Sequence, residues 1–63
     1  MSVHELIPKL MKFMRFHGKV TIDTIHNYTG YGKATIRSAL DIMHKSGLVR
    51  KENKRPTIFS LNN

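Results

Sequence analysis

The stretch from Thr29 to Val49 reads T-G-Y-G-K-A-T-I-R-S-A-L-D-I-M-H-K-S-G-L-V and decides the fold. It opens with two glycines that predict a turn. Gly30 can adopt the left-handed conformation, and Gly32 can cap the helix that follows. The apolar residues that follow recur at helical spacing, which predicts an amphipathic helix over about residues 33–46. Gly47 ends that helix. Its inward stripe consists of Ile36, Ala39, Leu40 and Met43.

The opposite face of this helix is basic and carries mostly short side chains. At about 100° per residue, seven side chains project there: Lys33, Ala34, Arg37, Ser38, Asp41, His44 and Lys45. Short or hydrogen-bonding groups in the first turns suit close approach to base edges in a major groove. The pattern is typical of a helix that is presented to DNA.

Two further helices are predicted before the turn. Apolar residues from Ser2 to Phe16 recur every three or four positions, and Ser2 with Glu5 matches a capping box. Pro8 lies on the outer face, where it either bends this helix or marks a start nearer His4.

The second helix is predicted from Ile22 to about Tyr28, with Thr21 as its N-cap. Four turn residues then separate it from the third helix, which is a helix-turn-helix length. We expect Tyr28 on the flank of this helix, and the rings of Tyr28 and Tyr31 directed toward the core.

After Gly47 the sequence predicts a β-hairpin. Residues 48–51 and 57–61 are apolar and β-branched segments, separated by the five residues E-N-K-R-P. A hairpin with a basic tip is a wing. The predicted fold of residues 1–63 is therefore α+β, a single winged helix-turn-helix domain of three helices and a two-stranded wing, with residues 19–21 as a possible short third strand.

Composition narrows the function. The chain has 63 residues, and 11 Lys and Arg against 4 Asp and Glu give a formal charge of +7, which favours polyanionic partners. The absence of cysteine excludes disulfides and thiolate metal sites and fits a cytoplasmic, nucleoid-associated setting. No signal peptide or membrane span is expected. The four histidines fall on different predicted elements, so we expect no metal. The sequence has no Cys nucleophile, no glycine-rich phosphate loop and no evident carboxylate pair, so we expect no catalytic group. No cofactor and no small-molecule effector are expected.

The segment 29–49 resembles the DNA-binding domain of GntR-type and related bacterial winged helix regulators. In size the chain is more similar to free-standing small regulators of fimbrial phase variation and to short winged helix proteins of phages and plasmids. Two departures are Gly32, where Ser or Thr is usual, and His26, where a small residue usually packs. The places of the family pattern are taken by Gly32, Lys33, Ala34, Thr35, Ile36, Arg37, Ala39, Leu40, Gly47, Leu48 and Val49.

The resemblance implies that Lys33, Thr35 and Arg37 contact DNA, with the wing tip around Lys54 and Arg55 on the backbone or minor groove. From residue chemistry we expect Arg37 to bond two acceptors of guanine, the alternative being a surface pair with Asp41. The expected base contacts are Lys33, Ala34, Arg37 and Ser38, and the expected backbone contacts are Thr35, Lys45, Arg50, Lys51, Lys54 and Arg55.

The sequence thus predicts a small sequence-specific regulator of transcription that binds double-stranded DNA and is not an enzyme. One alternative is a protein-interaction adaptor with an acidic partner. RNA binding is less favoured, because we expect no exposed aromatic platform. A homodimer is a further hypothesis, with Met11 and Phe16 in the contact surface.

Overall fold

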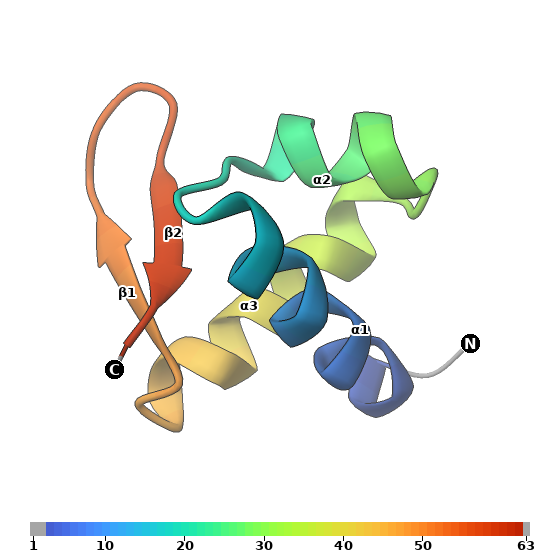
Figure 1. Ribbon diagram of the computed structural model, residues 1–63, viewed down its shortest axis with the longest axis horizontal. Helices are drawn as coiled ribbons and strands as arrows, with labels where there is room; N and C mark the ends of the chain where they lie inside the picture. The colour runs from blue at the N-terminus through green and yellow to red at the C-terminus, as the bar shows by residue number, and fades with distance from the viewer. Residues whose placement is uncertain (1–2, 63) are drawn as a thin grey trace.

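A computed structural model describes residues 3–62, which form three helices followed by a β-hairpin (Figure 1). This order confirms the predicted α+β winged helix-turn-helix. The predicted capping box at Ser2 lies outside the described residues. The elements are α1 (Val3–His17), α2 (Ile22–Thr29), α3 (Lys33–Lys45), β1 (Val49–Glu52) and β2 (Ile58–Leu61).

The core lies where the three helices meet the inner face of the hairpin. The predicted stripe of α3 is fully buried, and each of its four side chains has no exposed surface. One core in so short a domain contributes only about 3 to 5 kcal/mol of net stability. The buried set is Leu6, Leu10, Met14, Val20, Ile25, Ile36, Ala39, Leu40, Met43, Val49 and Phe59.

The helix ends follow the local chemistry of the sequence. The Thr21 hydroxyl accepts a hydrogen bond from the backbone N–H of Thr24 at 3.1 Å, so Thr21 caps α2 as predicted. Gly30 closes α2 with a φ of 78°, the left-handed conformation that a glycine adopts without strain. Gly32 caps α3 without any side-chain hydrogen bond.

Helix α1 spans Val3–His17, begins next to His4 and continues through Pro8. Pro8 is exposed, as its place on the outer face requires. Met11 is half-buried and packs against the core, whereas Phe16 is 87% exposed. Of the two residues assigned to a dimer contact, only Phe16 presents a free apolar surface.

The wing is an antiparallel pair in which Val49 lies opposite Leu61 and Lys51 opposite Phe59. Val20 extends the pair by one isolated bridge, because its N–H and carbonyl each bond the backbone of Phe59 at 2.8 Å. The possible third strand over residues 19–21 is thus reduced to a single bridge, and the sheet has two strands. The bridge ties the segment between α1 and α2 to the wing.

One expectation about the helix-turn-helix needs revision. Tyr28 is 70% exposed and is not directed into the core; Tyr31 is half-buried and packs against it. Tyr28 lies in the last turn of α2, where its ring meets Phe13 and His17 at the surface, with centroids 5.8 and 5.1 Å away. His26, which replaces a small residue, places Nδ1 2.6 Å from the carbonyl oxygen of Tyr31 and so braces the turn.

Candidate nucleic-acid interface

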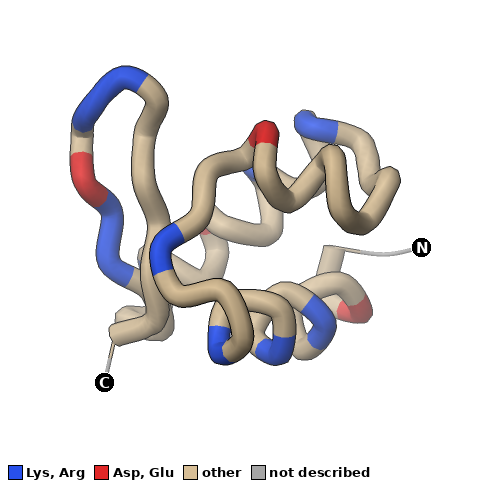
Figure 2. Tube along the Cα trace, turned by 45° about the horizontal axis from the view of Figure 1, so that its top comes forward, with Lys and Arg blue, Asp and Glu red and all other residues tan. Residues whose placement is uncertain are grey.

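A groove of about 410 Å³ lies between the start of α3 and the tip of the wing. Helix α3 contributes Lys33 and Arg37 to its lining, and the wing loop contributes Lys54 and Arg55. Figure 2 shows the basic residues at the tip of the hairpin, with an acid only further down the strand. Cations on both walls of one groove create a local positive potential that suits a phosphate backbone. The sequence predicted these four residues as contacts, and the fold brings them together.

One wall of the groove contains an ion pair. Nζ of Lys33 lies 2.8 Å from Oδ1 of Asp23, and both side chains are more than half exposed. The hydrogen bond from Lys33 and its positive charge hold the pKa of the Asp23 carboxyl below its ordinary value. Lys33 is therefore oriented by the start of α2.

Arg37 stands between this groove and a smaller hollow of about 180 Å³. Asp41 and Lys51 line that hollow together with Arg37. Among residues 3–62, no ion pair joins Arg37 to Asp41, so the alternative of a surface pair is not what the side chains adopt. The Arg37 guanidinium remains exposed beside the basic groove.

The other predicted contact residues are spread more widely. Ala34 and Ser38 are exposed on the outer face of α3, whereas Thr35 is half-buried. Lys45 is exposed at the far end of α3. Arg50 lies opposite Ser60 and lines a separate hollow with Lys19 and His44, so it lies outside the α3–wing groove. The groove collects only part of the predicted set.

Sequence reasoning missed several residues of the groove. The pair of Asp23 with Lys33 was not predicted, because a contact between the starts of two helices follows no local period in the sequence. Thr21 and Ile22 line the groove from the start of α2, and Pro56 and Thr57 line it from the wing. The proline in the predicted hairpin loop was a signal for rigidity there.

Residues 3–62 contain no group of three or more His, Cys, Asp or Glu placed to hold a metal ion. No helix within these residues is long and apolar enough to cross a membrane.

Comparisons with known proteins bear on the fold and on DNA binding. No protein-family model and no curated protein matched the chain. Among solved structures, the chain is similar to the Zalpha domain from Carassius auratus PKZ, in a crystal structure of that domain in complex with Z-DNA. The two are 27% identical, the match covers 95% of this chain and 97% of the other, and the TM-score is 0.89. The chain thus has the fold of a DNA-binding winged helix domain over almost its full length.

Proposed function

We propose that this protein binds double-stranded DNA through the α3–wing groove and prefers the left-handed Z form. The observation that carries the proposal is the near full-length match to a domain solved with Z-DNA, at 27% identity and a TM-score of 0.89. The groove supplies the chemistry, since Lys33, Arg37, Lys54 and Arg55 all line it.

Recognition of this kind depends on backbone shape more than on base sequence. Phosphate contacts position a protein on a duplex but carry no sequence information directly. A duplex of the opposite hand follows a different backbone path, so cations fixed on two walls can select it by shape. Asp23 lines the groove and Asp41 lines the smaller hollow beside it. Their negative charges disfavour phosphates that approach in other arrangements, which reduces non-specific binding.

A second candidate is a sequence-specific transcriptional regulator that inserts α3 into the major groove of right-handed DNA. The exposed guanidinium of Arg37 favours it, because that group can bond two acceptors of a guanine. The resemblance of segment 29–49 to GntR-type and small fimbrial, phage or plasmid regulators also belongs to this candidate. In that case Arg37→Ala flattens sequence preference, whereas Lys54→Ala weakens binding to all sequences alike.

Circular dichroism of an alternating CG duplex separates the two candidates. If the proposal is right, titration with the protein at moderate salt converts the duplex to the Z form, and the circular dichroism spectrum of the duplex inverts. Lys33→Ala and Arg37→Ala should reduce the conversion. Arg15→Ala, which removes the same charge from α1, is the matched control and should convert the duplex normally.

A parallel selection from a random duplex pool completes the test. Recovery of a defined site that binds in the right-handed form, with no inversion of the CG duplex, would support the regulator and reject the Z preference. Binding to neither duplex would reject both and favour the protein-interaction adaptor.

A further inference from the structure

Aromatic rings cluster where the C-terminal ends of α1 and α2 meet. The rings of Phe13 and His17 stack with centroids 4.1 Å apart, and the ring of Tyr28 lies 5.1 Å from that of His17. Phe16 extends the cluster, with its centroid 6.2 Å from His17. We call Phe16, His17 and Tyr28 the aromatic patch.

The patch is open to solvent. Phe16 is 87% exposed and Tyr28 is 70% exposed, whereas Leu48, the other large exposed apolar side chain in the described residues, is 36% exposed. A ring left in water contributes little to folding, because the stability gained from a phenyl group comes from its burial. Exposed aromatic faces of this kind are the surfaces on which unpaired bases stack.

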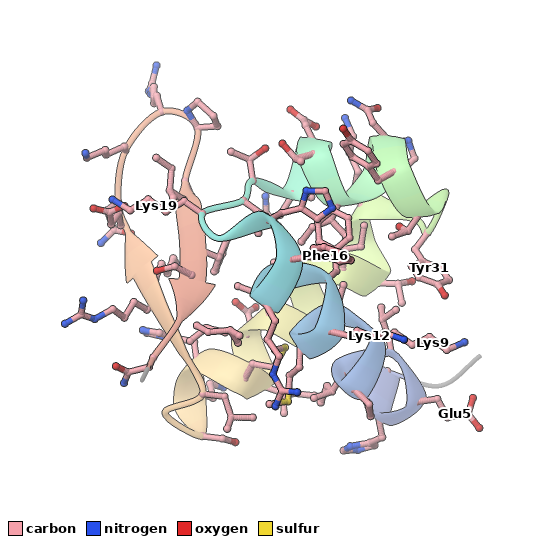
Figure 3. All side chains as sticks on the ribbon, in the orientation of Figure 1. Glu5, Lys9, Lys12, Phe16, Lys19 and Tyr31 are labelled. Carbon is pink, nitrogen blue, oxygen red and sulfur yellow. The ribbon has the colours of Figure 1, made fainter. Side chains whose placement is uncertain are left out.

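Basic side chains continue from the patch along the outer face of α1. Lys9, Lys12 and Phe16 follow one another at helical spacing and lie along the exposed side of the helix (Figure 3). At 1.5 Å per residue, Lys9 and Phe16 are about 10 Å apart along the helix axis. Within residues 3–62 the ion pairs involve Lys19, Lys33 and Lys54 and neither of these α1 lysines.

We propose that this face of α1, together with the aromatic patch, is a second nucleic-acid site that takes single strands. Bases stack on Phe16 and Tyr28, and phosphates lie against Lys9 and Lys12, which is the combination found in proteins that bind single strands without sequence preference. No residue of α1 lines the groove between α3 and the wing. The proposal does not depend on the Z-form preference, and the two surfaces can be occupied together.

Charge favours this occupant over a second copy of the chain. In a symmetric dimer both copies present the same face, so the contact would gather two Lys9 and two Lys12 side chains. Like charges at such a contact are unfavourable, whereas a polyanion neutralises them.

The test measures fluorescence anisotropy of a labelled oligothymidylate with the full chain. Phe16→Ala and Tyr28→Ala should each weaken binding about fivefold or more, as expected for one lost stacking contact. Leu48→Ala removes an exposed apolar side chain elsewhere and should bind as the parent does. Far-ultraviolet circular dichroism checks the fold of each variant; should Phe16→Ala misfold, Tyr28→Ala and Lys12→Gln carry the test.

A charge-matched pair separates the two surfaces. Lys12→Gln should weaken binding of the single strand more than binding of the CG duplex. Lys54→Gln should do the opposite, although both variants lose one positive charge. Equal effects of the two variants on the single strand would overturn the proposal, as would displacement of the single strand by saturating duplex. It would also be overturned if Phe16→Ala abolished a dimer in sedimentation yet left single-strand binding unchanged.

Discussion

Asp23 and Lys33 join the first turns of α2 and α3 by an ion pair of 2.8 Å between Oδ1 and Nζ. The pair lies in the lining of the basic groove, so a carboxylate stands beside the cations that would meet a phosphate backbone. A phosphate that enters the groove must compete with Asp23 for Lys33.

Asp23→Asn should tighten duplex binding, because it removes that competitor and one negative charge from the groove. We expect a gain of about two- to fivefold, since exposed ion pairs are weak. Anisotropy with the CG duplex measures it. Glu5→Gln makes the same change of net charge outside the groove and should have a smaller effect. Weaker binding by Asp23→Asn would instead assign the carboxylate a role in holding Lys33 in position.

The ionisation of Asp23 should respond to Lys33. The hydrogen bond from Lys33, then its charge, lower the pKa of Asp23 from 3.8. Because the pKa is lower in the folded state, the pair stabilises the fold above pH 3.8 and this contribution is lost as the pH falls through the lowered pKa. In an NMR titration, Lys33→Gln should raise the midpoint of Asp23, and Lys45→Gln should leave it in place.

The salt dependence of duplex binding should count the cations of the groove. If about four to six phosphates are neutralised, log K should fall with log salt at a slope of roughly −4 to −5. Arg37→Ala and Lys54→Ala should each make the slope shallower by about one. Arg15→Ala serves as the control on α1. An unchanged slope for both groove variants would show that they do not contact phosphates.

Gly30→Ala should destabilise the fold through its backbone alone. Gly30 has a φ of 78° and no atom within 4 Å of an added Cβ, so the cost is conformational, about 1 kcal/mol. For a domain of this size that lowers Tm by about 4 to 8 °C in thermal unfolding. Gly32→Ser is the matched control: its φ is −62° and a serine can cap α3, so stability should rise by a few tenths of a kcal/mol, on the order of the difference between these caps.

His26 should matter through one hydrogen bond. The carbonyl of Tyr31 can only accept, so Nδ1 of His26, 2.6 Å away, is the donor. His26→Ala should cost about 1 kcal/mol in urea unfolding because the carbonyl loses its partner. His26→Asn places an amide donor near the same position and should recover part of the loss. Equal stability of all three proteins would show that the bond adds nothing.

The fold was predictable because its signals are local. The helical spacing of apolar residues and the glycines on either side are enough to place α3. Gly32 and Gly47 bound the stripe of Ile36, Ala39, Leu40 and Met43, and all four side chains are buried. Thr21, a residue type favoured at the N-cap, likewise marked the start of α2. The wing followed from two β-branched segments around a polar loop.

The site was predictable only in part, because it depends on contacts between elements. The lysines and arginines of the groove were named from their chemistry. The pair of Asp23 with Lys33 and the exposure of Tyr28 were not, since each is set by how α1, α2 and α3 pack. RNA binding was less favoured because Tyr28 was expected to face the core; Tyr28 is largely exposed, so that expectation is wrong, and Phe16 is exposed near it. Whether the predicted contact residues touch DNA stays a prediction.

The bridge between Val20 and Phe59 holds the wing at a fixed distance from the helices. Two backbone hydrogen bonds of 2.8 Å anchor the wing to the helical body, and backbone bonds do not depend on which side chains line the opening. Substitutions at the tip or on α3 can therefore retune charge and chemistry without altering the spacing between the two walls. The backbone therefore sets the width of the ligand that the groove accepts, and the side chains set the affinity for it.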